Sequence, residues 1–507
     1  MNQTNLKIGQ LIAQIRQERH LTQAEFAKKV GTSQSAINRI EHGGQNLSLE
    51  TLGRISDVLN KQLISINQGG LNLRIEGGNQ LSGEITLKTS KNSAVSLLCA
   101  SLLNYGVTRF KSFPRIEEVY RIIEVLESIG VSVKWFANND IEIRRPAKLN
   151  IENINKVSAK KTRSVLMLLG PLIHEFKEFK LPYAGGCKLG RRTVNPHLFA
   201  LEELGVNIQT KNETYAISVK KKSTDRIVLY ERGDTVTSNI IMALARFRGP
   251  TIINFGSANY AIQDVCLYLE KLGIKIDGIG QTTLTIKGVE GPIRKNISFS
   301  PSEDPIEAMF FITAAVCTNS TITIRRVPID FVAIELLKLK KMGLKFNMSE
   351  RYKADNGFTD LVDLKIYKHD YRLEAVEDSI HSQPYPGLNA DNLPYFVPIS
   401  VIAKGRTLIH DWMYDNRAIY YTELTKIGAQ IELADPHRVY INGPSTFKPA
   451  DVVCPPALRP ASLLLIGMLA AHGISILRNV YTINRGYEDL AERLNNLGAK
   501  ITVLHEV

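Results

Sequence analysis

The sequence has few cysteines and no long hydrophobic segment. Its five cysteines are odd in number, widely spaced and never form a Cys-x-x-Cys pair (Cys99, Cys187, Cys266, Cys317 and Cys454). This pattern argues against a disulfide framework and against a zinc site. No run of about 18 apolar residues occurs, and the first residues lack the basic-then-apolar order of a signal peptide. We therefore expect a cytoplasmic protein that uses neither a metal nor another cofactor and does not contact a membrane.

Acidic residues are also fewer than basic residues. The 507 residues include 63 Lys and Arg against 50 Asp and Glu, which gives a net charge of +13 and favours anionic partners. Lys and Arg outnumber Asp and Glu by only 8 to 5 in residues 1–67, so +10 of the net charge lies in the remaining chain. A charge spread through the larger part fits a small-molecule anion site better than a nucleic-acid surface there. A chain of this length predicts about three domains.

Residues 7–67 have the pattern of five short helices. Thr22 followed by Glu25 is a capping box that begins a helix, and Gly31 ends that helix. Thr32 or Ser33 opens the next helix three to four residues later. A helix, a short glycine turn and a second helix is the spacing of a helix-turn-helix.

This segment closely resembles the helix-turn-helix domains of phage repressors. The resemblance implies DNA binding, with Gln34, Ser35, Asn38 and Arg39 facing the groove and Gln23 supporting the contact at the phosphate backbone. Amide and guanidinium groups can pair with base edges, which suits these positions. A homodimer is expected, because repressor-type heads usually bind DNA as dimers. The alternative is a helical module that docks on another protein.

After a polar, glycine-rich stretch that ends at Gly70, the chain alternates between strand and helix patterns and repeats itself. Six segments share the order Leu-x-x-apolar-Gly at the end of a helix, followed by a strand with alternating apolar residues. Their glycines are Gly130, Gly205, Gly273, Gly343, Gly428 and Gly498. Each should lie just after the helix in the left-handed conformation. We interpret the body as six copies of one α/β unit.

A body of six such units, three in each of two inside-out α/β barrels, resembles the enolpyruvyl transferases. From about Leu71 to Leu504 the chain is similar to the family of UDP-N-acetylglucosamine 1-carboxyvinyltransferases. The resemblance implies an α/β (α+β) body of six βαβαββ-like repeats, preceded by the small all-α domain in residues 1–67 and a linker in 68–72. It places residues 73–90 and 301–507 in one lobe, residues 91–300 in the other, and the active site in the cleft between the lobes.

The segment 181–192 places Cys187 between a glycine pair and a third glycine that two arginines follow. Glycines allow the backbone to approach a ligand closely, and nearby cations lower the pKa of a thiol. A plain surface turn is the alternative. The resemblance implies a mobile lid, with Cys187 as general acid and Arg192 as a phosphate-binding residue.

The resemblance assigns roles to further residues. Lys91 would contact phosphoenolpyruvate, Asn92 the sugar, and Asp391 would move the proton of the acceptor hydroxyl. The other substrate-binding residues that it implies are Arg163, Asn195, His197, Arg417, Arg459 and Arg485. Solvated surface charges, turn residues and helix caps are the alternative reading of the same residues.

The implied activity is the transfer of an enolpyruvyl group from phosphoenolpyruvate to UDP-N-acetylglucosamine, the first committed step of peptidoglycan precursor synthesis. Three departures from the family pattern put the acceptor in question: Asn195 and Ala457 replace aspartates, and Tyr230-Glu-Arg-Gly233 replaces a loop that holds the nucleotide. Two alternatives stay open. The enzyme uses another nucleotide sugar or a nucleoside as acceptor, or the chain is a transcription regulator whose body senses a ligand.

Overall fold

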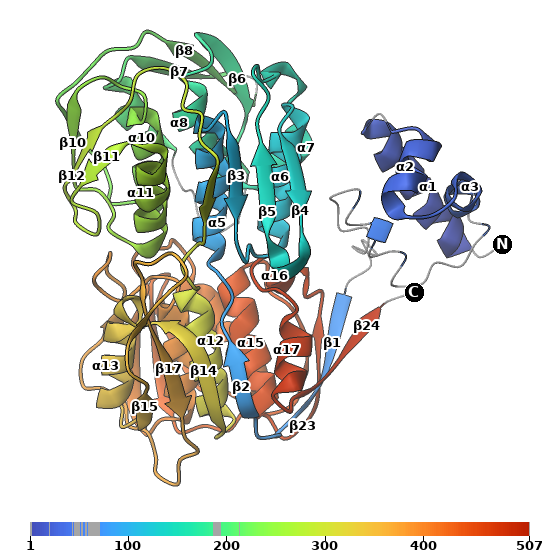
Figure 1. Cartoon of the computed structure of the whole chain (residues 1–507). Helices are drawn as coiled ribbons and strands as arrows, with labels where there is room; N and C mark the ends of the chain where they lie inside the picture. Colours follow the sequence, from blue (N-terminus) through green and yellow to red (C-terminus); the bar gives the residue numbers. More distant parts are fainter. Residues whose placement is uncertain are drawn as a thin grey trace. The chain divides into compact units, whose positions relative to one another are not determined.

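The computed structural model describes residues 3–19, 21–42, 44, 51, 54–55, 58, 71–185, 194–211 and 213–505. The chain divides into two compact units, residues 1–69 and residues 70–506. Each unit is described by itself below (Figure 1). No helix among the described residues is both long and apolar enough to span a membrane.

The first unit is helical: it contains α1 (Gln3–Glu18), α2 (Gln23–Val30) and α3 (Gln34–Glu41). The predicted capping box is confirmed, because the Thr22 hydroxyl accepts from the Glu25 amide at 3.2 Å and Glu25 Oε2 accepts from the Thr22 amide at 2.9 Å. Gly31 ends α2 in the left-handed conformation with φ 74°, and Ser33 caps α3. α1 begins earlier than the sequence pattern predicts. The three helices pack on a core that includes Ile12, Phe26 and Ile37.

The second unit contains two hydrophobic cores. One is built from residues 94–299 and the other from residues 73–87 together with 306–501. We call the parts around them the upper lobe and the lower lobe, after their places in Figure 1.

The upper lobe is built from helices and short strands in alternation. Its helices are α5 (Lys91–Ala100), η1 (Ser101–Leu103), α6 (Glu117–Ser128), η2 (Ala137–Asn139), η3 (Ile151–Asn153), α7 (Lys156–Lys161), η4 (Arg163–Leu168), α8 (Leu169–Leu172), α9 (Asn195–Glu202), α10 (Asp234–Leu244) and α11 (Tyr260–Leu272). Its strands are β3 (Val107–Phe110), β4 (Ser132–Trp135), β5 (Ile141–Arg144), β6 (Glu178–Pro182), β7 (Val206–Lys211), β8 (Thr214–Val219), β9 (Arg226–Val228), β10 (Pro250–Asn254), β11 (Lys275–Asp277), β12 (Leu284–Lys287) and β13 (Ile297–Phe299).

The lower lobe combines the first two strands of the unit with its whole C-terminal part. Its helices are α12 (Pro305–Cys317), η5 (Ile329–Phe331), α13 (Ala333–Lys341), η6 (Leu393–Tyr395), α14 (Phe396–Ile402), η7 (Ala418–Ile427), α15 (Leu458–Ala470), α16 (Tyr481–Asn484) and α17 (Leu490–Asn496). Its strands are β1 (Leu71–Gly77), β2 (Ser82–Thr86), β14 (Thr321–Pro328), β15 (Phe346–Met348), β16 (Tyr352–Lys353), β17 (Asp360–Ile366), β18 (Ile380–His381), β19 (Gly405–His410), β20 (Ile431–Asp435), β21 (Arg438–Gly443), β22 (Asp451–Val453), β23 (Gly473–Arg478) and β24 (Lys500–His505).

The strands form six sheets in the described part of the chain, three in each lobe. Five of them are mixed, and the sheet β6-β8-β7 is antiparallel. The upper-lobe sheets have the orders β13-β3-β5-β4, β6-β8-β7 and β11-β12-β10-β9, and the lower-lobe sheets β22-β23-β1-β24, β15-β17-β14-β2 and β18-β19-β21-β20. In Figure 1 the strands β1 and β24, from opposite ends of the unit, lie side by side, and they pair in antiparallel register.

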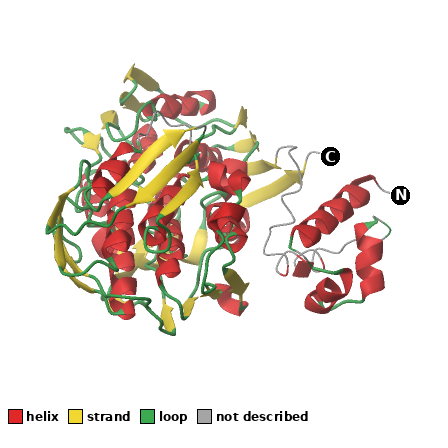
Figure 2. Ribbon diagram, turned by 90° about the horizontal axis from the view of Figure 1, so that it is seen from above, coloured by secondary structure: helices red, strands yellow, loops and turns green. Residues whose placement is uncertain are grey.

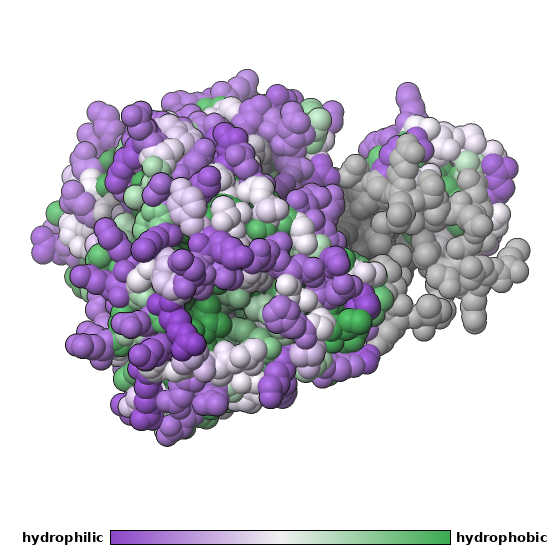
Figure 3. Space-filling model, turned by 90° about the horizontal axis from the view of Figure 1, so that it is seen from below, coloured by the Kyte–Doolittle hydropathy of each residue, from purple (hydrophilic) through white to green (hydrophobic). Residues whose placement is uncertain are grey.

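Some helices are buried on every face and therefore form the centre of each lobe. Residues 93–100 of α5, 236–244 of α10, 305–316 of α12 and 459–469 of α15 are all buried. A helix that is apolar all round must lie inside a protein, and the sheets cover these helices (Figure 2). Hydrophilic side chains cover much of the face of the molecule in Figure 3.

The predicted glycine repeat is confirmed. All six glycines that end the Leu-x-x-apolar-Gly segments are left-handed, with φ between 75° and 100°. Left-handed geometry after a helix favours glycine, which has no Cβ to clash with the backbone.

Two chain crossings join the lobes at one place. The Ser90 amide donates to the Ser302 carbonyl at 2.8 Å, and the Asp304 amide donates to the Lys88 carbonyl at 2.9 Å. These paired crossings lead directly into α5 and α12. Lys91, the first residue of α5, and Asp304, which caps α12, are therefore brought to the junction between the lobes.

Candidate active site

Lys91 and Asn92 form the first turn of α5 at this junction. Ser90 caps the helix and accepts from the amides of Asn92 and Ser93. Lys91 Nζ donates to Asn92 Oδ1 at 2.8 Å, and Asn92 Nδ2 donates to the Tyr260 hydroxyl at 3.1 Å. The cap and the buried Tyr260 thus fix a lysine and an amide next to each other at a helix N-terminus, which favours anions.

Asp391 lies between two arginines of the lower lobe. Its Oδ1 is 3.6 Å from Arg417 Nη1, and its Oδ2 is 3.6 Å from Arg459 Nη2. The Tyr414 hydroxyl donates to Oδ1 at 3.4 Å, and Asn389 Oδ1 accepts from the Asp391 amide at 2.8 Å. The Asp391 side chain is 24% exposed. The carboxylate is therefore held from several sides and still reaches solvent.

Arg417 is buried, and groups of the protein accept its hydrogen bonds. It donates to both oxygens of Asp411, at 2.5 and 2.8 Å, and to the Ala390 carbonyl at 2.6 Å. Asp411 is fully buried and also accepts from the Tyr421 hydroxyl. Because Arg417 ties this buried carboxylate to the residue before Asp391, its geometry fits a role in positioning Asp391. Direct contact between Arg417 and a substrate stays a prediction.

A second carboxyl group supports the Asp391 loop. Glu335 of α13 is 1% exposed, and its Oε1 accepts from the Asn389 amide at 3.1 Å and from Asn392 Nδ2 at 2.8 Å. Glu335 Oε2 has no hydrogen-bond partner among the described residues. Burial raises the pKa of Glu335 to about 7, although the hydrogen bond from Asn392 opposes this. Sequence reasoning missed this residue, because a glutamate in a short helix usually faces solvent.

Arg459 begins α15 beside a buried aromatic pair. Its Nη1 donates to the Tyr487 hydroxyl at 3.0 Å, and that hydroxyl also contacts the Tyr395 hydroxyl. Ala457 occupies the N-cap position of α15, where among the described residues no side chain caps the helix. With Ala457 at this position, the N-cap side chain offers no acceptor to the amides of the helix end.

Arg485 reaches from the lower lobe to the upper lobe. Its Nη2 donates to Glu118 Oε2 at 3.1 Å, and Glu118 Oε1 accepts from the Thr162 hydroxyl at 2.5 Å. Burial would raise the pKa of Glu118, but Lys91, Thr162 and Arg485 outweigh burial and hold that pKa below its ordinary value. Glu118 is thus an anion that two predicted site cations, Lys91 and Arg485, share. Sequence reasoning missed it.

Glu488 links the lobes next to this pair. Its Oε1 accepts from Lys88 Nζ at 2.8 Å and from Asn139 Nδ2 at 3.0 Å, while Oε2 accepts from the Arg115 amide at 2.8 Å. A small crevice at the junction is lined by Lys88, Lys91, Asp304, Glu307, Gly486 and Glu488, among others. Glu488, three residues after Arg485, therefore holds the two lobes together.

The remaining predicted residues lie on the upper lobe. His197 is 2% exposed, with Nε2 3.3 Å from the Thr235 hydroxyl and Nδ1 3.1 Å from Asn239 Nδ2. Burial and the nearby Arg163 lower the pKa of His197 to about 3, so the ring is neutral near pH 7. This geometry ties α9 to α10. Asn195 is exposed at the first position of α9.

Cys187 and Arg192 lie outside the described residues, so their predicted roles stay predictions. The four other cysteines lie in or against the hydrophobic cores: Cys99, Cys266 and Cys454 are buried, Cys317 is half-buried, and burial raises the pKa of each.

The altered loop 230–233 touches both lobes. The Arg232 guanidinium donates to the Tyr385 carbonyl of the lower lobe. Asp234, which follows this loop, accepts from the Ser257 hydroxyl at 2.5 Å and from Asn259 Nδ2 at 3.0 Å. Burial raises the pKa of Asp234; Ser257 and Asn259 oppose this, and the negative charge of Asp391 adds to it. No group of three or more His, Cys, Asp or Glu that could hold a metal occurs among the residues described.

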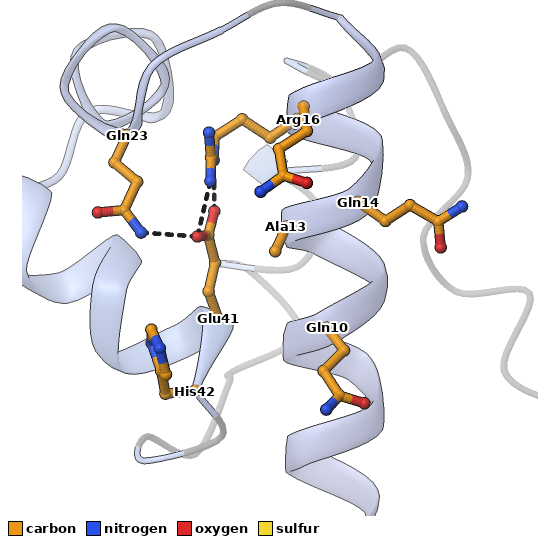
Figure 4. Close-up of a pocket in the computed structure, with 8 residues that line it drawn as sticks. Gln10, Ala13, Gln14, Arg16, Gln23, Glu41 and His42 are labelled. Carbon is orange, nitrogen blue, oxygen red and sulfur yellow. Dashed lines mark hydrogen bonds and ion pairs between the residues drawn. The ribbon is translucent and has the colours of Figure 1, made fainter.

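In the helical unit, the four residues predicted to face DNA are exposed on α3: Gln34, Ser35, Asn38 and Arg39. Gln23 Nε2 donates to Glu41 Oε2 at 2.7 Å (Figure 4), and its contact with the phosphate backbone of DNA stays a prediction. Arg16 donates to both oxygens of the same Glu41, at 2.5 and 2.9 Å. This buried pair fixes α1 against α3.

The family comparisons agree with this architecture. Residues 75–494 match the family described as EPSP synthase (3-phosphoshikimate 1-carboxyvinyltransferase), and residues 12–65 match the family described as Helix-turn-helix. The body of the chain therefore belongs to the EPSP synthase family, and it follows a helix-turn-helix unit.

Within this family the chain is similar to proteins named UDP-N-acetylglucosamine 1-carboxyvinyltransferase. One from Campylobacter jejuni is 33% identical over 86% of this chain and 99% of the relative. One from Bacteroides fragilis is 32% identical over 84% of this chain and 98% of the relative. The sequence-based recognition of the family is confirmed.

Solved structures show the fold. The enolpyruvyl transferase NikO from Streptomyces tendae superposes with a TM-score of 0.75 at 21% identity, over 87% of this chain and 100% of that chain. EPSP synthase from Acinetobacter baumannii gives a TM-score of 0.67 at 18% identity, over 86% of this chain and 100% of that chain. The predicted fold class is confirmed.

Proposed function

We propose that the body transfers the carboxyvinyl group of phosphoenolpyruvate to the hydroxyl of UDP-N-acetylglucosamine and releases phosphate. The relatives at 33% identity support this activity, because they carry that name and match over nearly their whole length. The structural observation that carries the proposal is the Asp391 site: a partly exposed carboxylate lies 3.6 Å from Arg459, in the lobe whose Arg485 reaches across to Glu118, the anion that also interacts with Lys91. We place the reaction between lobes formed by residues 73–90 with 301–507 and by residues 91–300.

The charges of this site suit phosphoenolpyruvate, which carries a carboxylate and a phosphate. Lys91, Arg459 and Arg485 supply three cations, and a guanidinium can hold either anionic group through two parallel hydrogen bonds. Arg192 and Arg163 would add to this binding. Asn92 and Asn195 would bind the acceptor through their amides, and His197 would support α9 beside them.

In the proposed reaction, the Cys187 thiol gives a proton to the terminal alkene carbon of phosphoenolpyruvate. The acceptor hydroxyl then forms a bond to the central carbon and gives its proton to Asp391. The bond from the central carbon to the phosphate oxygen breaks, and phosphate leaves. The terminal carbon then returns one proton to the Cys187 thiolate, which restores the alkene in the product. Lys88, Asn139 and the Arg115 amide hold Glu488, so the lobes stay together around this step.

A phosphate-release assay with Asp391→Asn tests the proposal. The change keeps the size of the side chain and removes the charge that a base needs, so the rate should fall about 100-fold or more. Asp451→Asn is the matched control, because Asp451 is 50% exposed and pairs only with surface Arg478 among the described residues. Cys187→Ser should also lower the rate. An unchanged rate in both Asp391→Asn and Cys187→Ser would overturn the assignment of roles.

The loop 230–233 favours a second candidate, in which the acceptor is another nucleotide sugar or a nucleoside. Glu231 carries a negative charge there, and Arg232 is bound to Tyr385 of the other lobe. Turnover of phosphoenolpyruvate with such an acceptor, together with no turnover with UDP-N-acetylglucosamine, would support this candidate. A ligand that changes DNA binding without any turnover would support a sensor instead.

We infer that the helix-turn-helix unit binds DNA through the exposed residues of α3, as a homodimer. Arg39 and Asn38 offer the guanidinium and amide groups that pair with base edges. Binding of a mixed-sequence duplex at low salt should weaken as salt rises, because each phosphate contact releases counterions. Light scattering of the full chain with and without the duplex measures the oligomeric state. Duplex binding that does not respond to Arg39→Ala would contradict this assignment.

A further inference from the structure

Two aromatic rings of the upper lobe form an exposed corner. Tyr230 is 73% exposed and Phe199 is 46% exposed. Their ring centroids are 5.4 Å apart at an angle of 65°, so the edge of one ring meets the face of the other. Val228, two residues before Tyr230, is also exposed. Single exposed apolar residues are ordinary, but contiguous groups of them indicate a binding surface.

The corner carries a polar group next to its rings. Asn195 and Phe199 are four residues apart on α9, which places them on the same side of the helix, and both are exposed. An amide beside a ring face can hydrogen-bond the edge of a planar ligand that stacks there. A flat heteroaromatic ring with donors and acceptors on its edge has the chemistry that this corner would bind.

Buried contacts hold the corner in place. His197, on the opposite side of α9 from Asn195, contacts Thr235 and Asn239 of α10 through its two ring nitrogens. Arg232, two residues after Tyr230, donates to the Tyr385 carbonyl of the lower lobe. The first contact fixes the helix that carries Phe199, and the second fixes the loop that carries Tyr230. The second contact also places the corner beside the junction of the lobes.

We propose that Phe199 and Tyr230 form a stacking site for the planar ring of the acceptor, with Asn195 contacting the edge of that ring. The inference rests on the proposed function, which supplies a nucleotide acceptor, and it adds the residues that recognise the base. Stacking on an aromatic side chain strengthens the binding of a base, whichever base it is. Because the ring lies away from the reacting hydroxyl, its loss should weaken acceptor binding and leave the chemical step largely unchanged.

The test uses the full chain and the variants Phe199→Ala, Tyr230→Ala and their double variant. The double variant should raise the KM for UDP-N-acetylglucosamine about 10-fold or more, which corresponds to the loss of stacking. The KM for phosphoenolpyruvate and kcat should each stay within about twofold of the parent values. Tyr230→Phe keeps the ring and should behave as the parent. Phe358→Ala is the control, because Phe358 is 50% exposed and lies on the lower lobe.

Equilibrium binding separates this inference from the proposed function. Calorimetry compares uridine, which has the base, with N-acetylglucosamine 1-phosphate, which lacks it. If the protein shows no turnover but the double variant loses uridine binding, the proposed acceptor reaction fails and the stacking site stands. If the double variant binds uridine and UDP-N-acetylglucosamine as the parent does, the stacking site is refuted. A variant that only changes the oligomeric state, with ligand binding intact, also refutes it and identifies the corner as a contact between copies.

Discussion

Glu335 gives a quantitative test of how the Asp391 loop is held. The glutamate is buried, and one of its oxygens accepts from the Asn389 amide and from Asn392 while the other has no partner among the described residues. Burial raises its pKa from an ordinary value of 4.5 to about 7. A protonated carboxyl would still accept both hydrogen bonds, so Glu335→Gln should keep the loop in place.

The sign of the effect follows from proton binding. Between pH 4.5 and about 7 the native protein binds the Glu335 proton more tightly than the unfolded chain does. Stability from this group is therefore fully present below pH 4.5 and is lost as pH rises through about 7. One pKa unit corresponds to about 1.4 kcal/mol, so the whole effect is about 3 kcal/mol, and about 2 to 3 kcal/mol of it falls between pH 5 and pH 8. Glutamine does not titrate, so the Glu335→Gln variant should not lose this stability as pH rises.

Urea unfolding of the parent and of Glu335→Gln at pH 5, 6, 7 and 8 measures the difference. Between pH 5 and pH 8 the free energy of unfolding of the variant should rise by about 2 to 3 kcal/mol relative to that of the parent. Glu377→Gln, at an exposed position of the same lobe, is the control and should track the parent. Parallel curves for the parent and Glu335→Gln would refute the reasoning, because they would show that Glu335 does not titrate in this range.

Three further changes test other parts of the structure. Asp411→Asn removes the buried carboxylate that pairs with Arg417, which leaves Arg417 only the more distant carboxylate of Asp391 among the described residues. The change should lower the free energy of unfolding by about 3 to 5 kcal/mol, measured in urea; a loss under 1 kcal/mol would contradict the pairing. Glu118→Gln removes the anion that Arg485 and Lys91 share, so steady-state kinetics should show a KM for phosphoenolpyruvate raised about 10-fold; an unchanged KM would show that Glu118 does not position these cations. Arg39→Ala should weaken duplex binding, and a lost phosphate contact would reduce the slope of log affinity against log salt by about 1; equal affinities for parent and variant would remove Arg39 from the interface.

The sequence predicted the local features of this fold well. The Thr22 capping box and the six left-handed glycines depend on neighbours within a few residues, and the structure has them all. The site residues were assigned by family resemblance, since Lys91 lies far along the chain from Asp391 and Arg459. Only the paired crossings and the lobe cores bring their elements together.

The carboxylates that support the site could not be predicted in the same way. Glu117 and Glu118 are adjacent glutamates at the start of α6 and look alike in the sequence. Only the structure shows that Glu118 meets Arg485 of the other lobe. Glu335 gives no sign of its burial, because its short helix also carries three lysines. Long-range packing decides which acids become part of a site.

The most direct test of the central claim is the product formed from phosphoenolpyruvate and UDP-N-acetylglucosamine. Mass spectrometry of the reaction mixture should show an acceptor that has gained one carboxyvinyl group, in a one-to-one ratio with the phosphate released. Asp391→Asn should abolish both signals together. Parent protein that leaves UDP-N-acetylglucosamine unmodified, under conditions where it is folded and saturated with both compounds, would contradict the claim.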